Sequence, residues 1–249
     1  MLIKAAINGT RAQTEHPAIP VTAEQQAEEA KAAVAAGAGA IHVHVRGANA
    51  QESLAPEDVS LCLETIRAAC PGIPVGISTG AWIIPDLTKR LALIREWKVL
   101  PDFASVNIHE EGAELVIKLL LDLGVGVEAG VWNPRAAKTL VRSGLAKECL
   151  RILIETGEEA GDAKNNLAEI ESALGQINRP ILLHGLDDSA WEMVELAAMR
   201  NYDTRTGFED TLTLPDGSRA ENNAVLIADA RRIAARCKIA IVAESWRNS

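Results

Sequence analysis

The sequence predicts an α/β protein whose 249 residues form a single-domain (β/α)8 TIM barrel, residues 1–249. Three observations predict this fold. Strand-like apolar segments alternate with amphipathic helical segments along the whole chain, and strict βα alternation implies a parallel sheet. Eight such pairs can be counted. The length is close to that at which eight βα units close into one barrel, and no linker or change in composition marks a domain boundary.

The eight expected strands are short apolar segments, each followed by a helical pattern. Their ranges are Leu2–Asn8, Ala40–Val45, Ile73–Ser78, Phe103–Asn107, Val125–Gly130, Leu150–Glu155, Ile181–His184 and Asp203–Glu209. The boundaries of the fifth to seventh strands are the least sharply marked, so seven pairs in an open, doubly wound sheet are the alternative. Eight units favour closure into a barrel.

The helical segments between these strands carry their own start and stop signals. Thr22 and Gln25 have the spacing of a capping box, and Gly37 ends the first helical pattern three residues before the next strand. Between them, apolar residues recur at helical spacing at Ala27, Ala30, Ala33 and Val34. Later helical patterns open at Pro85, Gly112, Pro134 and Asp188, and others end at Gly72, Gly124 and Gly144.

Composition excludes several classes of function. A net charge of −9 disfavours binding to nucleic acid. No apolar run approaches the roughly 20 residues that cross a bilayer, and the short apolar N-terminal segment lacks the features of a signal peptide. The four cysteines form no Cys-x-x-Cys pair, so core thiols are expected. No Walker loop, nucleophile elbow or His-Glu-x-x-His motif is present. We therefore expect a soluble, cytoplasmic enzyme.

Two histidines alternate with aliphatic residues in the second expected strand. Ile41, Val43 and Val45 occupy one face, so His42 and His44 share the other. The aliphatic face is expected to pack on helices, which directs both histidines into the barrel at the C-terminal end of a strand, where barrel enzymes build their active sites. Two neutral imidazoles at this spacing suit one shared divalent cation. Core histidines satisfied by hydrogen bonds are the alternative interpretation.

A carboxylate from another strand end would complete a ligand set that leaves the cation open to water or substrate. Glu209 is the best candidate, because it ends the eighth expected strand, shares a face with Arg205 and precedes Asp210. A surface Arg/Glu cluster is the alternative interpretation. Glu128 and Glu155, at the ends of the fifth and sixth expected strands, are weaker ligand candidates.

Polar side chains also gather at the other expected strand ends, where they could line a substrate pocket. They are Asn8, Thr10, Ser78, Thr79, Ser105, Asn107, His109, Glu110 and His184. Each of them alone is more often a turn or helix-capping group than a functional one, except that His184 could equally be a mouth residue or a turn-stabilising side chain.

Taken together, these residues resemble the β-keto acid cleavage enzyme family. The matching segments are Ala5–Gly9, Pro17–Thr22, Ile41–Arg46, Ser78-Thr79-Gly80, and Arg205-x-Gly207-x-Glu209-Asp210 followed by Leu214-x-x-Gly217 and Asn223. The resemblance is nearly end to end. Its His-x-His and Arg-x-Gly-x-Glu-Asp elements are specific in combination, whereas Ser-Thr-Gly alone is not.

The resemblance implies a zinc ion held by His42, His44 and Glu209. It also implies transfer of CoA from acetyl-CoA to a β-keto acid, with release of acetoacetate, by an acyltransferase. A zinc ion with an open position acts as a Lewis acid on the keto carbonyl. Asp210, oriented by Arg205, would be the base that removes the proton between the two carbonyls.

The resemblance also implies substrate contacts. Ser78 would bind the substrate carboxylate, and Asn107, Glu128 and Arg11 are the other expected contacts. The chain departs from the family in having Thr10 and Arg11 where an acidic residue commonly follows the first strand. After Asn107 it lacks the family's glycine and hydroxyl residue. Its loops after the third, fifth and seventh strands are shorter, which removes material that could bind CoA or a neighbouring subunit.

Arg11 bears on the substrate's charge. A guanidinium near the pocket would repel a substrate ammonium group and could pair with a second carboxylate, which predicts a neutral or dicarboxylic β-keto acid. In the alternative, Arg11 points to solvent or pairs with Glu15.

Two other functions stay open at this point. One is a metal-dependent hydrolase or lyase on the same barrel, since a His-x-His pair also suits water activation. The other is a noncatalytic barrel that binds a metabolite. For the leading interpretation, the expected partners are a small β-keto acid and acetyl-CoA, with no nucleic acid and no membrane, and a homo-oligomer is expected.

Overall fold

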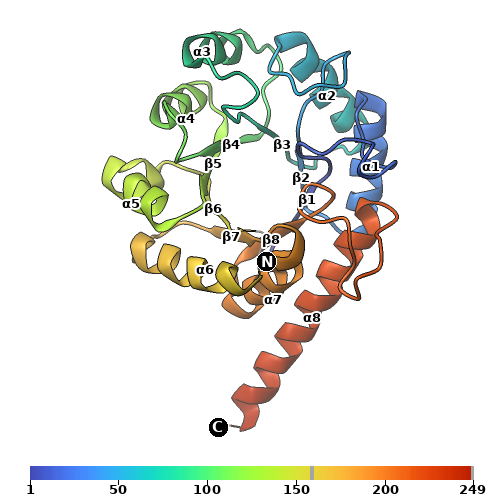
Figure 1. Cartoon of the computed structure of the whole chain (residues 1–249), viewed down its shortest axis with the longest axis vertical. Helices are drawn as coiled ribbons and strands as arrows, with labels where there is room; N and C mark the ends of the chain where they lie inside the picture. The colour runs from blue at the N-terminus through green and yellow to red at the C-terminus, as the bar shows by residue number, and fades with distance from the viewer. Residues whose placement is uncertain (158–159, 248–249) are drawn as a thin grey trace.

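The computed structural model describes the backbone of residues 1–157 and 160–247, and the side chains of these residues apart from 160, 161 and 238–247. Eight parallel strands close into a barrel in sequence order, ringed by helices (Figure 1). The strands are β1 Ile3–Ala6, β2 Ala40–Val43, β3 Val75–Ser78, β4 Phe103–Asn107, β5 Gly126–Val131, β6 Arg151–Glu155, β7 Ile181–His184 and β8 Asp203–Thr206. The predicted (β/α)8 barrel is confirmed.

The helices lie between consecutive strands and after the last one. They are α1 Ala23–Ala36, α2 Pro56–Ala69, α3 Leu87–Glu96, α4 Ala113–Asp122, α5 Pro134–Ser143, α6 Ala160–Leu174, α7 Ala190–Arg200 and α8 Asn223–Arg247, with short 3-10 helices at Leu145–Lys147 and Asp187–Ser189. Thr22 and Gln25 form the predicted capping box of α1, and Gly37 ends that helix in the left-handed conformation. The predicted stop signal at Gly144 likewise ends α5.

Three strands, β1, β2 and β8, end earlier than predicted, and the differences in β2 and β8 affect the site. β2 ends at Val43, so His44 follows the strand. β8 ends at Thr206, so the prediction that Glu209 lies on a strand face with Arg205 is wrong. A Cβ at Gly207 would come within 2.1 Å of the Ala6 carbonyl oxygen, so only glycine fits there. The chain then turns, with the Asp210 and Thr211 amides donating to the Gly207 carbonyl.

The barrel interior contains a group of paired charges near the N-terminal ends of the strands. Lys4 is fully buried and pairs with fully buried Glu128. Arg151 Nε lies 3.3 Å from a Glu128 oxygen, and its Nη1 donates to Asp203 at 3.0 Å. Below the C-terminal mouth, the barrel is therefore closed by paired charges.

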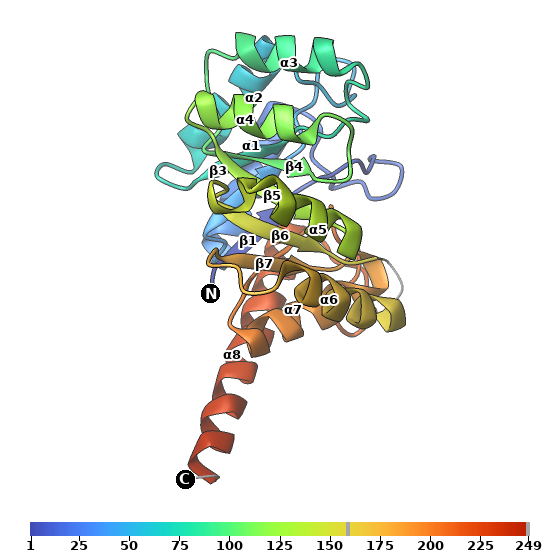
Figure 2. The ribbon, with the colours of Figure 1, turned by 90° about the vertical axis from the view of Figure 1, so that its left-hand side faces the viewer.

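The apolar core lies outside these charges, and the C-terminal part of the last helix extends beyond it. Ile41 and Val43 are fully buried in the main hydrophobic cluster, as their alternation with His42 predicts. α8 packs on α1 and α7, and its C-terminal part projects away from the barrel (Figure 2). Among the described residues, no helix is both long enough and apolar enough to cross a membrane.

Candidate metal centre

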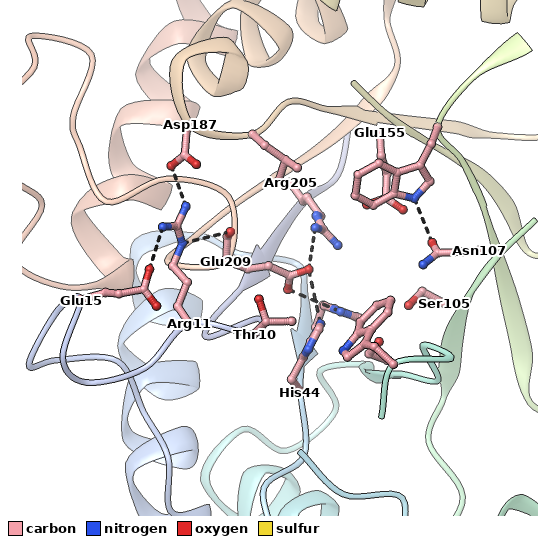
Figure 3. Close-up of a pocket in the computed structure, with 15 residues that line it drawn as sticks. Thr10, Arg11, Glu15, His44, Ser105, Asn107, Glu155, Asp187, Arg205 and Glu209 are labelled. Atoms are coloured by element: carbon pink, nitrogen blue, oxygen red, sulfur yellow. Dashed lines mark hydrogen bonds and ion pairs between the residues drawn. The ribbon is translucent and has the colours of Figure 1, made fainter. Parts of the chain in front are cut away.

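Two histidines and a glutamate meet at the C-terminal mouth of the barrel. His42 Nε2 lies 3.5 Å from one oxygen of Glu209, and His44 Nε2 lies 3.4 Å from the other. One ligand atom of each residue lies within 4.8 Å of the others. The two rings are nearly perpendicular, with centroids 5.3 Å apart, and Figure 3 shows the Glu209 carboxylate reaching toward His44. The predicted triad therefore converges with the nitrogen and oxygen donors that suit a divalent cation.

The first βα turn brings these three residues together. The side chain of Asn8 accepts a hydrogen bond from the His44 amide and donates one to the His44 carbonyl, both at 2.9 Å. Gly9 has a φ of +59°, and a Cβ there would come within 2.5 Å of the Glu209 side chain. Asn8 thus holds the backbone of His44, while glycine at position 9 leaves room for the Glu209 side chain.

The electrostatics of the three residues differ although all are enclosed. Burial lowers the pKa of His42 well below its usual value, so this ring is neutral. Burial also opposes a charge on His44, but the carboxylates of Glu209 and Glu52 outweigh it and raise the His44 pKa to about 9. Arg205 and the two histidines outweigh burial in Glu209 and hold its pKa well below the usual range. Glu209 is therefore an anion at neutral pH.

The residues present fit a bound cation. Glu209 Oε2 is a buried oxygen that has no hydrogen-bond partner among the described residues, and it faces His42 Nε2. An ionised oxygen without a donor is costly inside a protein, and a divalent cation would satisfy it. Three protein ligands would leave a tetrahedral ion one open position.

Arg205 joins the triad to a second buried carboxylate. Its Nη2 donates to Glu209 Oε1 at 2.7 Å and to Asp210 Oδ1 at 2.8 Å. His184 Nδ1 lies 3.2 Å from Asp210, and its Nε2 lies 3.3 Å from Glu155. Burial and Arg205 lower the pKa of His184, but Asp210 and Glu155 outweigh them and raise it. The predicted catalytic pair Arg205 and Asp210 is therefore in direct contact.

An open pocket of about 290 Å³ lies over this cluster. Of the predicted site residues, it is lined by His42, His44, Ser78, Asn107, Arg11, Arg205 and Glu209. Asp210 is 1% exposed and lies just behind this lining. The pocket thus combines the triad with three of the four predicted substrate contacts.

Glu128 is the exception. It was expected at the end of the fifth strand, but it is the third residue of β5 and is fully buried against Lys4 and Arg151. It does not line the pocket. The pattern placed it too near the mouth because β5 continues through Val131, one residue further than expected.

The other predicted contacts have protein partners. The Ser78 hydroxyl accepts from the Gly80 amide at 3.3 Å, and Asn107 accepts from Trp132 Nε1 at 3.0 Å. Arg11 donates to Asp187 at 2.6 Å and to Glu15 at 3.3 Å, as Figure 3 shows. The predicted Glu15 pairing is therefore present, although Arg11 also faces the pocket.

Sequence reasoning missed several residues of the mouth, among them Trp82, Trp132 and Glu52. Trp82 and Trp132 line the pocket, and Glu52 contacts His44 Nδ1 from the loop after β2. Loops have no periodicity that would reveal such contacts, so a tryptophan close behind a strand end was the only available signal.

Residues 1–245 match the model of a family described as beta-keto acid cleavage enzyme. Two similar proteins are named 3-keto-5-aminohexanoate cleavage enzyme. One, from Fusobacterium nucleatum subsp. nucleatum, is 26% identical over 94% of this chain and 91% of its own length. The other, from Acetoanaerobium sticklandii, is 25% identical over the same shares.

Solved structures share the fold at lower identity. A ternary complex of ObcA with a C4-CoA adduct and oxalate has a TM-score of 0.67 and 16% identity, and the match covers 87% of this chain but only 63% of that one. An N-acetylneuraminic acid synthetase from Leptospira borgpetersenii has a TM-score of 0.59 and 15% identity, covering 94% and 84% of the two chains. These two likenesses concern the barrel alone.

Proposed function

The chain belongs to the β-keto acid cleavage enzyme family, and from this premise we propose that it is a zinc-dependent acyltransferase that condenses a β-keto acid with acetyl-CoA. The products are acetoacetate and a new acyl-CoA. The observation that carries the proposal is the convergence of His42, His44 and Glu209 at the floor of an open pocket.

The ligand set determines what the site can do. His42 and His44 would hold zinc through Nε2, and Glu209 through its carboxylate. Bound zinc would supply Lewis-acid polarisation of the keto carbonyl, which makes the adjacent carbon acidic. Among divalent ions, a set of two imidazoles and one carboxylate suits zinc, and its open position leaves room for a substrate oxygen.

Asp210 would act as the base, and Arg205 would hold it in place. Asp210 Oδ2 is buried without a hydrogen-bond partner among the described residues, while Oδ1 is held by Arg205. Asp210 would take the proton from the carbon between the two carbonyls. That carbon then attacks the thioester of acetyl-CoA, and the CoA thiolate leaves. The thiolate attacks the keto carbon of the substrate, and the bond between the keto carbon and the carbon that carried the proton breaks. This releases the new acyl-CoA and the carbanion of acetoacetate. Acetoacetate takes the proton back, so the base is regenerated.

Ser78 and Asn107 are the proposed contacts for the substrate carboxylate, because both line the pocket beside the triad. Arg11 is already paired with Asp187 and Glu15, so a second substrate carboxylate would have to displace a carboxylate of the protein. Of the two expected substrate types, we therefore propose the neutral β-keto acid.

The test combines metal analysis with a substrate panel. Purified protein is expected to carry about one zinc ion per chain. It should form acetoacetate from β-keto acids only when acetyl-CoA is added. Cleavage without any CoA ester would favour a hydrolase or lyase on the same barrel. Bound metal without turnover of any β-keto acid would favour a noncatalytic binding protein.

A further inference from the structure

The loop between β2 and α2 places a carboxylate directly behind one of the two histidines. Glu52 Oε1 lies 2.6 Å from His44 Nδ1, the ring nitrogen that faces away from Glu209. The other oxygen, Oε2, accepts a hydrogen bond from Trp82 Nε1 at 3.0 Å. The Glu52 side chain is 12% exposed and that of His44 is 4% exposed. Both oxygens of a largely buried carboxylate are thus engaged.

This contact determines where the His44 proton lies. A carboxylate accepts hydrogen bonds, so Nδ1 must carry the hydrogen that points to Glu52. In the neutral ring, Nε2 then has a free lone pair that points to the side of Glu209. Such a carboxylate behind a ligating histidine fixes both the tautomer and the ring orientation.

The two histidines are unequal in this respect. His42 Nδ1 is buried and has no hydrogen-bond partner among the described residues. No described residue orients the His42 ring through this nitrogen. The support from Glu52 therefore acts on one ligand of the pair, the one that lies beyond the end of its strand.

Trp82 contacts both Glu52 and the His44 ring. Its ring stacks on His44 with centroids 6.1 Å apart and planes 24° apart. A Cβ at position 80 would lie 2.2 Å from the Trp82 ring, so Gly80 is what lets the indole lie here. The loops after β2 and β3 thus meet around the His44 ring.

Glu52 itself is held by backbone contacts. Arg46 and Glu52 form an antiparallel bridge, the Ser53 amide donates to the Val45 carbonyl at 2.9 Å, and the Gly47 amide donates to the Gln51 carbonyl at 2.8 Å. The loop is therefore a small hairpin that returns the carboxylate to His44. Because the hairpin already holds Glu52 in place, this side chain loses little conformational freedom when it orients His44.

From this geometry we propose that Glu52 is a positioning residue for the metal centre. Together with Trp82, it holds the His44 ring so that Nε2 is presented to the ion. The inference rests on the proposed metal site but concerns residues outside the predicted ligand set. It predicts that zinc affinity depends on a carboxylate that does not itself bind zinc.

The experiment measures zinc affinity by competition with a chromophoric chelator. Glu52→Ala should weaken zinc binding about 10- to 100-fold. Glu52→Gln keeps an oxygen that accepts from Nδ1 and should lose less. Trp82→Phe keeps an aromatic ring but removes the donor to Glu52, so its loss should be the smallest. Glu64→Ala, at an exposed position on α2, is the matched control and should bind like the native protein.

The readouts separate the possible failures. Thermal melts in chelator establish that each variant is folded, and Glu52→Gln covers the case in which the alanine variant is not. If native protein binds zinc and Glu52→Ala binds it equally well, the role of Glu52 is overturned while the metal site stands. If native protein binds no divalent metal, both the proposed function and this inference are overturned.

Discussion

Two clusters of buried charge occupy the same barrel, and they differ in how their charges are balanced. The lower cluster contains two cations and two anions, Lys4 and Arg151 with Glu128 and Asp203, so its formal charge sums to zero. At the mouth, Arg205 faces two anions, Glu209 and Asp210. With both histidines of the triad neutral, as metal binding requires, the charges of Arg205, Glu209 and Asp210 sum to −1. The lower cluster is complete within the chain, whereas the upper one suits an added cation.

The largest expected effect is on metal content. His42→Ala removes one of three ligands, so we expect zinc occupancy to fall to background while the metal-free protein keeps its melting temperature. Inductively coupled plasma analysis of the purified variant measures this. His109→Ala, which changes an exposed histidine outside the triad, is the control and should keep its zinc. Full occupancy in both His42→Ala and His44→Ala would place the site elsewhere.

A substitution in the lower cluster should lower the stability of the metal-free protein, which His42→Ala should leave unchanged. Lys4→Ala leaves Glu128 buried without its closest partner, which is expected to lower the free energy of unfolding by about 3–5 kcal/mol. Urea denaturation of the metal-free protein measures the change. The double variant Lys4→Met, Glu128→Leu removes both charges and should recover most of the loss. An unchanged unfolding midpoint for Lys4→Ala would contradict the contrast between the two clusters.

Asp210 tests the catalytic half of the upper cluster. Asp210→Asn nearly preserves the shape of the side chain but cannot accept the substrate proton. We expect turnover to fall by at least about a hundredfold, with zinc content and fold retained. Steady-state kinetics with metal analysis of the same sample measures both. Native turnover in this variant would exclude Asp210 as the base.

The pH dependence of zinc binding sharpens the comparison further. In the metal-free protein His44 has a pKa raised to about 9, so near neutral pH its ring carries a proton that zinc must displace. Zinc affinity should therefore rise about tenfold per pH unit as the pH approaches 9, and then level off. Calorimetry in buffers of different ionisation enthalpy should detect release of about one proton near pH 7. Affinity that is constant between pH 7 and 9 would contradict this charge state.

The smallest expected effect concerns Arg11. Its side chain contacts the carboxylates of Asp187 and Glu15 and the backbone carbonyl of Glu209, so Arg11→Gln should change KM for a neutral β-keto acid by no more than about fivefold. Kinetics with a neutral substrate and with a β-keto dicarboxylate of similar length provide the comparison. A native preference for the dicarboxylate that disappears in Arg11→Gln would show that Arg11 binds the substrate instead.

Most of the fold and part of the site could be predicted from the sequence, for physical reasons. The alternation around His42 predicts its inward direction because the side-chain period of a strand is fixed. Glu209 was predicted to be a ligand, but the turn that presents it depends on the close approach of Gly207 to Ala6, which no local pattern reveals. Glu52 was missed because its partner is eight residues away across a hairpin loop. Glu128 was placed too near the mouth because strand ends are the least sharply marked parts of a pattern.

Asn8 gives the His44 backbone the fixed position of a residue inside a sheet, although His44 lies past the end of β2. Its side-chain amide makes with His44 the pair of hydrogen bonds that a neighbouring strand would otherwise make. The backbone of His44 is therefore anchored by the turn after β1, whereas the loop between β2 and α2 contacts its ring through Glu52. Loops on this face that contain neither Glu52 nor Trp82 can lengthen, shorten or change sequence during evolution while His42, His44 and Glu209 keep their spacing. Substrate range and metal binding can thus be inherited separately on one barrel.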